Sequence, residues 1–414
     1  MEAPVKSSPA MRSLVLALGP AFRFIDKRRE KTTAQQIAIC QMRAPTFHEQ
    51  RRARHVRKLL GASSLQRVRT DRAGNVLGLR RGTQGKRRLV VAAHLDTVFP
   101  ANVLPRVTRA GSRGQVLKAP GIADNAGGVA AMLAIIEALD RAGVRTRDDV
   151  LFVGTVGEEA LGNLRGVRHL LRTAISRERV SGFVALDGSN PRKLVTSGPA
   201  IRRYRVTFKG RGGHSWGAFG TPNPLHAAGR LIARLASTRV PAHPKTTFNV
   251  GVVSDGQDPD ARAGVVVTAV PSSAAIELDL RSERAGPLAK LEAGFKLALD
   301  RALEEEKRHA TQHADTLRAV IKQIGDRPAG RTPRSARIVR AALESYARFG
   351  MPLTCVCSST DATYPMSLGI PAVTVPQGGR GRNTHTLDEQ INIAGRERAI
   401  KAALLLIVRL ARPA

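Results

Sequence analysis

This sequence contains six side chains that can bind metal ions or move protons, and each lies inside a short and distinctive stretch. Every one of them lies where an apolar, strand-like run ends or where a loop begins. Together they supply two imidazoles and four carboxylates, enough for two metal sites and one carboxylate left free to move protons. The pattern therefore indicates a two-metal hydrolase. In chain order these residues are His94, Asp124, Glu158, Glu159, Asp187 and His385.

His94 and Asp96 lie in the stretch VVAAHLDTVFP, directly after an apolar run. Residues two apart in an extended backbone point the same way, so Asp96 can support the His94 ring from behind. The alternative is a surface loop with a turn-forming aspartate. A histidine that directly follows VVAA is not typical of a surface loop, which favours a metal ligand.

Asp124 precedes a glycine-rich helix start in GIADNAGGVAAML. Taken alone, it would be an ordinary helix N-cap. Beside His94, however, a carboxylate can bridge two cations through its two oxygens, and this is the interpretation that we adopt.

Glu158 and Glu159 follow the apolar run LFVGTVG. Adjacent glutamates point in different directions, so one can bind a metal ion while the other exchanges protons with water and a leaving group. The alternative is an exposed helix start, where acidic residues are common. Further along, Asp187 follows FVAL, and His385 lies in the polar loop GRGRNTHTLDEQ, where it would supply the second imidazole.

Apolar runs and helical spacing place these residues on an alternating series of strands and helices. Such alternation predicts an α/β fold, with a mainly parallel sheet covered on both faces and its ligands along one rim. The expected strands are 76–79, 89–93, 150–156, 183–186 and 372–375, and the expected helices are 31–60, 127–139, 335–346 and 396–410.

The pattern changes near residue 197, where polar and apolar residues begin to alternate over 202–209. This change predicts an α+β block with antiparallel strands, and the segment GDRPAG at 325–330 is typical of a linker. We therefore expect a discontinuous catalytic domain, residues 1–198 and 326–414, with residues 199–325 inserted as a second domain. Within the insertion, strands are expected at 246–253, 265–270 and 274–280, and helices at 224–235 and 288–308.

Composition limits the class of protein further. The three cysteines argue against a disulfide scaffold, and no apolar run reaches the length of a membrane span. The N-terminal stretch is a poor signal peptide, so we expect a cytoplasmic protein without membrane contact. The formal charge of +34 comes from basic residues spread over the whole chain rather than gathered in one patch. This distribution favours a charged surface over specific nucleic-acid binding.

These motifs, in this order, resemble the zinc-dependent aminoacylase/carboxypeptidase family of metallopeptidases. Its members include glutamate carboxypeptidase, peptidase T, acetylornithine deacetylase and succinyl-diaminopimelate desuccinylase. The stretches HLDTVFP and SSTDATYPMSLGIPAVTV resemble the glutamate-carboxypeptidase branch most. The resemblance implies that His94 and Asp187 hold one metal ion, that Glu159 and His385 hold the other, and that Asp124 bridges them. It also implies that Glu158 is the general base and that Asp96 stands behind His94.

The resemblance extends to the insertion, which in this family is a dimerisation domain or lid. His214 follows a glycine pair, as does a histidine of relatives that reaches into the partner subunit's site and donates to the oxyanion. Arg281, in LDLRS, matches an arginine that holds a substrate carboxylate. Thr268 stands where relatives often carry a substrate-binding asparagine. A homodimer is therefore expected.

The function implied is hydrolysis of a peptide-type amide bond in a small peptide or N-acyl amino acid, with exopeptidase character. Two divalent ions are expected, zinc first, with cobalt or manganese as alternatives. One alternative function is an N-acyl-amino-acid deacylase of amino-acid metabolism, which would share every catalytic residue. A remote alternative is an inactive, basic nucleic-acid-binding protein built on the same fold.

Overall fold

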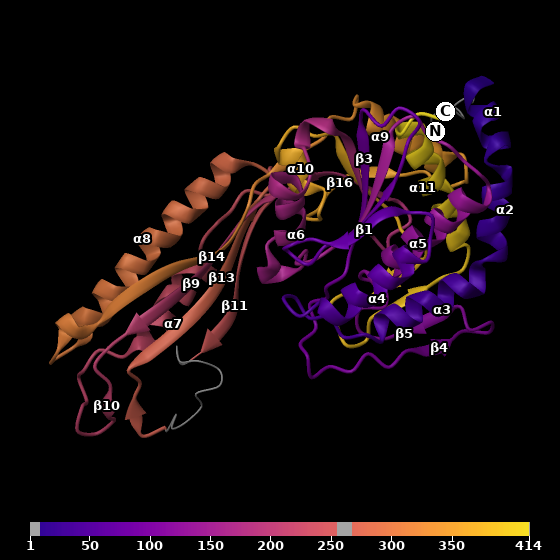
Figure 1. The fold of residues 1–414 in the computed structure, drawn as a ribbon. Coiled ribbons are helices and arrows are strands. Elements are labelled where there is room, and N and C mark those ends of the chain that lie inside the picture. The colour runs from indigo at the N-terminus through magenta and orange to yellow at the C-terminus, as the bar shows by residue number, and fades with distance from the viewer. Residues whose placement is uncertain (1–8, 255–266, 414) are drawn as a thin grey trace. The chain divides into compact units, whose positions relative to one another are not determined.

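A computed structural model describes residues 9–254 and 267–413 and divides the chain into two compact units. Unit 1 comprises Met1–Gly198 and Gly330–Ala414, and unit 2 comprises Pro199–Ala329. The chain therefore leaves unit 1 once and returns to it once (Figure 1). Unit 1 contains all six candidate residues from His94 to His385.

The centre of unit 1 is a mostly parallel sheet. Its four middle strands run parallel to one another, and strands at both edges are antiparallel to their neighbours. In spatial order the described strands are β1 (Gln66–Thr70), β2 (Val76–Arg80), β6 (Asp149–Thr155), β3 (Arg88–His94), β7 (Val180–Leu186), β17 (Ala372–Val375), β8 (Lys193–Gly198) and β15 (Gly330–Arg331), with β16 (Thr354–Cys357) also paired to β8.

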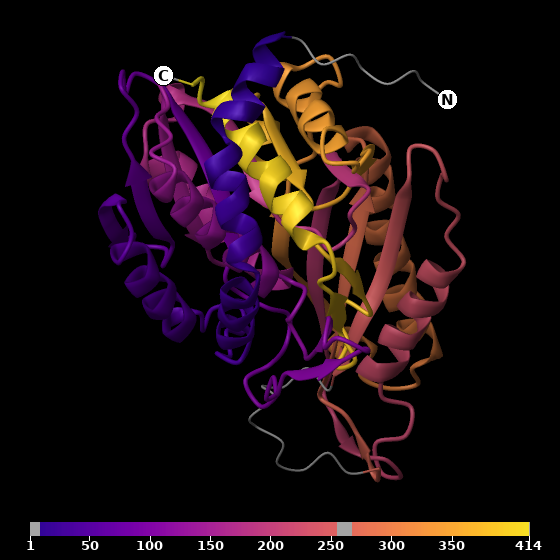
Figure 2. The same cartoon turned by 90° about the vertical axis from the view of Figure 1, so that its right-hand side faces the viewer.

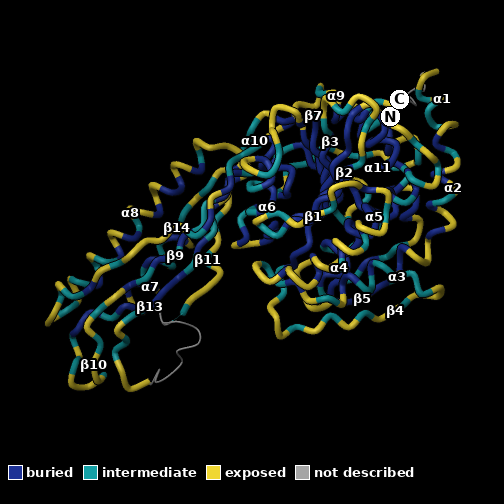
Figure 3. Tube along the Cα trace, viewed as in Figure 1, coloured by how far each residue is buried: buried dark blue, intermediate teal, exposed yellow. Residues whose placement is uncertain are grey.

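Short, wholly apolar runs form the middle strands because both faces of the sheet are covered. In β3, Val90 and Ala92 contribute to one buried cluster, whereas Leu89, Val91 and Ala93 contribute to another. The alternation follows from the two-residue repeat of a strand. Figure 3 shows these strands among the buried parts of unit 1.

Helices cover both faces of this sheet, as expected for the α/β class. On one face α11 packs against α9, α2 and α5, which are far apart in the sequence but adjacent in space (Figure 2). The helices of that face are α2 (Gly19–Lys27), α3 (Arg29–Cys40), α4 (Gln50–Gly61), α5 (Ala126–Arg141), α9 (Arg337–Ala347) and α11 (Arg396–Leu410). The other face is covered by α6 (Arg165–His169) and α10 (Thr363–Ser367) with the turn that follows α6. Helix α1 (Pro9–Ala17) precedes α2.

A small antiparallel sheet also belongs to unit 1. Its strands, in spatial order, are β18 (Arg380–Arg382), β19 (Gln390–Asn392), β5 (Val116–Lys118) and β4 (Thr108–Ala110). His385 lies in the loop that joins β18 to β19. Sequence patterns did not indicate this sheet, because each of its strands is only three residues long.

Unit 2 is an α+β layer structure, as the alternating pattern predicts. Its antiparallel sheet packs the apolar side chains of its strands against two helices in one hydrophobic cluster. The sheet contains β11 (Thr246–Ser254), β13 (Ser273–Ser282), β9 (Ala200–Lys209) and β14 (Arg318–Arg327), and the helices are α7 (Pro224–Ala236) and α8 (Ala285–His309). A short ribbon pairs β10 (Gly213–His214) with β12 (Ala269–Val270).

Three expected elements were wrong in detail. Residues 31–60 form two helices rather than one, because α3 ends at Cys40 and Pro45 cannot continue a helix. The linker expected at 325–330 begins inside β14, which runs to Arg327. Of the strand expected at 265–270, residues 265 and 266 lie outside the described residues, and only Ala269–Val270 is strand.

The described residues include no helix that combines the length and the apolar character required to cross a membrane. The three cysteines are free, as the low cysteine count suggests. Cys355 and Cys357 lie two apart in β16, and Cys40 is buried at the end of α3.

Gly128, in the first turn of α5, provides a test of this packing. A Cβ atom there would lie 2.1 Å from the Leu186 carbonyl oxygen and 2.2 Å from Asn125 Oδ1. We predict that Gly128→Ala lowers the free energy of unfolding by about 1–3 kcal/mol, because backbone at the end of β7 would have to move. Chemical denaturation of the purified variant measures the change.

Gly61 is the matched control, since it is also helical and also in unit 1, and a Cβ atom added to it would meet no heavy atom within 4 Å. Gly61→Ala should leave stability unchanged or raise it by up to about 1 kcal/mol. Equal stability of the two variants would contradict the close approach of α5 to β7.

Candidate metal centre

The ends of three parallel strands meet at one rim of the unit 1 sheet, and the candidate ligands lie there. His94 is the last residue of β3, Asp187 directly follows β7, and the Glu158–Glu159 pair follows β6 after a short turn. Carboxyl ends of parallel strands are the usual location of sites in open α/β sheets. Asp124 reaches the same place from the turn before α5.

Within the described residues, three overlapping groups of side chains could each hold a metal ion. In each group the potential ligand atoms lie within 4.8 Å of one another. The groups are His94–Asp124–Asp187, Asp124–Glu159–His385 and His94–Glu158–Glu159. The structure thus brings together all five residues expected as ligands and the glutamate expected as the base.

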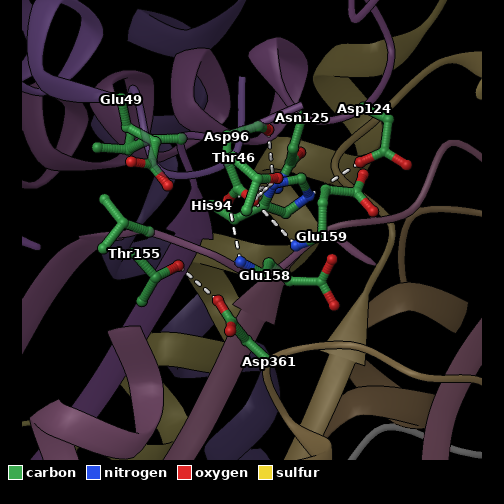
Figure 4. Close-up of polar contacts among 12 residues, drawn as sticks. Thr46, Glu49, His94, Asp96, Asp124, Asn125, Thr155, Glu158, Glu159 and Asp361 are labelled. Carbon is green, nitrogen blue, oxygen red and sulfur yellow. Dashed lines mark hydrogen bonds and ion pairs between the residues drawn. The ribbon is translucent and has the colours of Figure 1, made fainter. Parts of the chain in front are cut away.

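Asp124 is the residue that the first two groups share. Its Oδ1 lies 2.9 Å from His94 Nε2 (Figure 4). Its Oδ2 lies 3.2 Å from His385 Nε2. Each carboxylate oxygen therefore faces a different imidazole. Glu159 Oε1 lies 3.2 Å from the same His385 nitrogen, and Asp187 Oδ1 lies 4.0 Å from His94 Nε2.

These contacts shift the acidity of the residues strongly. Burial alone would raise the pKa of Asp124, but hydrogen bonds from His385 and His94 hold it well below its usual value. Hydrogen bonds to Asp124 and Glu159 raise the pKa of His385 to about 10. Burial and the negative charge of Asp124 raise the pKa of Asp187 to about 7. A cluster this rich in carboxylates calls for positive charge.

The donor atoms fit divalent metal ions. Imidazole nitrogen and carboxylate oxygen are ligands that zinc accepts, and a carboxylate with its two oxygens directed to two histidines suits a bridge between two ions. His94 also has a settled orientation, because its Nδ1 lies 3.1 Å from the Asp96 carbonyl oxygen. Since that oxygen can only accept, Nδ1 carries the proton and Nε2 is free to bind metal.

Asp96 makes further contacts besides the expected one with His94. Its carboxylate lies 3.7 Å from the His94 ring, but it accepts hydrogen bonds from the backbone N–H groups of Glu158 at 3.0 Å and Glu159 at 2.9 Å. The Thr46 hydroxyl donates a third, at 3.0 Å. Asp96 is fully buried, so these bonds firmly hold the glutamate pair at the end of β3 (Figure 4).

Glu389 is a supporting residue that sequence reasoning missed. This buried carboxylate accepts the N–H groups of Ala123 at 2.7 Å and Asp124 at 3.0 Å, and the His385 N–H lies 3.4 Å from its other oxygen. It thereby ties the loop of the bridging aspartate to the loop of the last histidine. The sequence feature that could have indicated this role is the position of an acidic residue four residues after His385.

Arg52 is a second such residue. Its buried guanidinium donates to the carbonyl oxygens of Leu95 at 2.8 Å, Met42 at 2.7 Å and Cys40 at 3.3 Å. Burial lowers its pKa, while the nearby charge of Asp96 opposes that shift. Arg52 therefore braces the backbone between His94 and Asp96 from the side of α4.

The remaining candidates belong to unit 2. His214 is exposed in β10, and its Nδ1 accepts the Trp216 N–H at 3.2 Å. Thr268 is exposed beside β12, where its carbonyl oxygen accepts the Ser215 N–H. Arg281, in β13, forms an ion pair with Asp279. Within unit 2, then, His214 and Thr268 share one ribbon, while Arg281 lies on the main sheet.

The sequence matches Peptidase family M20/M25/M40 over residues 90–412, which is most of the chain. The chain belongs to this family. It is therefore a metal-dependent hydrolase, as the motifs predict, and the expected resemblance is confirmed.

Individual relatives agree with this placement. The chain is 24% identical over 345 residues to the uncharacterised protein YqjE of Bacillus subtilis, with 81% of this chain and 83% of that protein covered. It is 29% identical to carboxypeptidase G2 of a Pseudomonas species over 214 residues, which cover 51% of this chain and 48% of that enzyme. Among solved structures, the di-peptidase Dug1p of Saccharomyces cerevisiae has the same fold, with a TM-score of 0.75 and 12% sequence identity. The match covers 95% of this chain and 98% of that protein.

Glu389 offers a test of how the centre is held. We predict that Glu389→Ala weakens metal binding by about 10- to 100-fold, because the Asp124 loop loses its acceptor. Competition with a chelator of known affinity measures the loss. Glu389→Gln, which keeps an oxygen acceptor for Ala123 and Asp124, should retain most of the affinity; an equal loss in both variants would contradict this role.

Proposed function

We propose that the protein uses two divalent metal ions, zinc first, to hydrolyse a peptide-type amide bond in a short peptide or N-acyl amino acid. The observation that carries this proposal is the Asp124 carboxylate, which belongs at once to the His94–Asp124–Asp187 group and to the Asp124–Glu159–His385 group. A carboxylate that two ligand groups share, with each of its oxygens facing a different imidazole, is the arrangement that a two-metal hydrolase requires.

His94 and Asp187 would hold one ion, Glu159 and His385 the other, and Asp124 both. When bound, such ions polarise the amide carbonyl and lower the pKa of water toward neutrality. The metal ligands come from loops that Asp96, Arg52 and Glu389 hold in place, so the chain supplies a preformed site.

Glu158 is proposed as the general base. Its backbone is fixed by Asp96, whereas the carboxylate of its neighbour Glu159 contacts His385. Figure 4 shows the two glutamate carboxylates directed differently. Glu158 can therefore take a proton from the attacking water and return it to the departing nitrogen.

His214 and Arg281 are proposed to act on the substrate. The Trp216 N–H occupies His214 Nδ1, which leaves the ring proton on Nε2, where it can be donated to a carbonyl oxygen as charge develops there. In keeping with the family resemblance, a second copy of this chain would supply the histidine, so we propose a homodimer. Arg281 would bind a terminal carboxylate, with Thr268 as a further substrate contact.

Glu158→Gln tests the base. We predict that turnover falls by about 100- to 10,000-fold while metal content stays near normal, because an amide cannot accept the proton but leaves the five ligands intact. Steady-state kinetics and elemental analysis of the same sample measure both quantities. A variant that retains most of its turnover would rule Glu158 out as the base.

A paired substrate panel tests the substrate class. We predict faster hydrolysis of dipeptides with a free terminal carboxylate than of the same compounds as amides, because Arg281 can pair with a carboxylate through two hydrogen bonds. Arg281→Lys keeps the charge but loses the paired geometry, so it should raise KM more than it lowers kcat. Preference for N-acetyl amino acids over dipeptides would instead identify an N-acyl-amino-acid deacylase.

A further inference from the structure

A basic cavity in unit 1 has no part in the chemistry proposed above. Its volume is about 540 Å³, within the size range of small-molecule sites. Four arginines line it, together with two side-chain amides, and none of the described residues in its lining is acidic. These six residues are Arg192, Arg380, Arg382, Arg398, Gln390 and Asn392.

The register of the small sheet builds one wall of this cavity. Arg380 lies opposite Asn392, and Arg382 lies opposite Gln390, across the antiparallel pair of β18 and β19. Residues directly opposite each other share a face, as do residues two apart along a strand. All four side chains therefore belong to the same face of the sheet, which presents two guanidiniums and two amides to the cavity.

The other two arginines come from separate parts of the chain. Arg192 lies just before β8, and Arg398 lies in the first turn of α11. Gly395, the N-cap of this fifteen-residue helix, also lines the cavity. The positive end of the helix dipole thus adds to the charge of the arginines.

The four guanidiniums lack the acidic partners that several other arginines of unit 1 have. Arg28 pairs with Glu137 at 2.7 Å, and Arg165 pairs with Glu49 at 2.6 Å. Over residues 9–254 and 267–413, by contrast, no ion pair involves Arg192, Arg380, Arg382 or Arg398. Like charges that converge without a partner repel one another, and a bound anion would relieve that repulsion.

We propose that this cavity binds a small polyanion, with at least two negative charges carried by phosphate or carboxylate groups. Arginine forks match both groups, and the amides of Gln390 and Asn392 can donate to the same oxygens. Met351 and Pro352 supply an apolar portion of the lining, which suits the carbon skeleton of a small organic molecule. A walled cavity with an apolar portion fits such a molecule better than the open stripe of charge that a nucleic acid needs.

The cavity is separate from the candidate metal centre in its lining residues but shares a hairpin with it. β18 and β19 carry the arginine and amide wall, and the loop between them carries His385 and Glu389. An anion that bridges this wall to Arg192 and Arg398 would hold the hairpin at its base. We therefore expect anion binding to raise the thermal stability of the metal-loaded protein.

The test is isothermal titration calorimetry on the metal-loaded full chain at about 150 mM salt, where weak surface charge effects are screened. Inorganic phosphate and malonate are the two probes, and they distinguish a phosphate from a dicarboxylate preference. We expect saturable binding of at least one probe to about one site per chain. Arg380→Gln combined with Arg382→Gln should weaken it about tenfold or more, as expected for the loss of charge-assisted hydrogen bonds.

Arg54→Gln combined with Arg57→Gln is the matched control, because both arginines are exposed on α4, outside the cavity, and the change in net charge is the same. The control should change affinity by less than about twofold, since only long-range charge is altered. If the β18 pair of substitutions prevents folding, Arg192→Gln with Arg398→Gln tests the same cavity from other segments.

Three results would overturn the proposal. The first is the absence of saturable binding by either probe. The second is an equal effect on affinity in the cavity and control variants: an equal loss would indicate diffuse charge, and no loss in either would indicate binding at the metal ions. The third is tighter binding of a single-stranded oligonucleotide that strengthens with its length and is insensitive to the cavity substitutions, which would indicate a nucleic-acid surface instead.

Discussion

The carboxylate of Asp124 is the contact on which the rest of the centre depends. Its two oxygens face two imidazoles that are almost three hundred residues apart in the sequence. Buried negative charge in such a place is unfavourable without a counter-charge, and the neighbouring Asp187 adds to the difficulty, as its raised pKa indicates. Divalent cations would neutralise this buried negative charge directly. The geometry and the family membership therefore both indicate a metal-dependent hydrolase.

The structure around the candidate metal centre fixes the loops that carry its ligands. Asp96 joins the end of β3 to the glutamate pair after β6, and Glu389 joins the Asp124 loop to the His385 loop. Arg52 donates to the carbonyl oxygen of Leu95, directly after β3, and to that of Met42, in the segment after α3. In each case a buried charged side chain forms hydrogen bonds with backbone groups of another segment, so its position is fixed by geometry as well as by electrostatics.

Sequence reasoning was strongest where a pattern was local. The apolar runs before His94 and Asp187 predicted buried strands with ligands at their ends, and the helix at 396–410 and the strand at 372–375 were placed with their observed bounds. Sequence reasoning failed where a residue forms its hydrogen bonds with a segment far away in the sequence. Nothing near Arg52 in the sequence indicates that it binds backbone from another segment, and the spacing of Glu389 from His385 does not reveal that it binds the backbone of Ala123 and Asp124. Asp96 lies beside the His94 ring as expected, but its hydrogen bonds from the Glu158 and Glu159 N–H groups were not foreseen, because those groups lie some sixty residues away.

The order of strands in the sheet of unit 1 has a consequence for how the chain folds. β17 lies between β7 and β8, yet it is synthesised only after the whole of unit 2. Unit 2 is a continuous segment and can acquire its structure as it leaves the ribosome, whereas the sheet of unit 1 must keep a gap open until the returning chain fills it. During that interval the edges of β7 and β8 lack their partner, and exposed strand edges attract other chains. Slow translation or a destabilised insertion would therefore be expected to cause aggregation well before it affected catalysis.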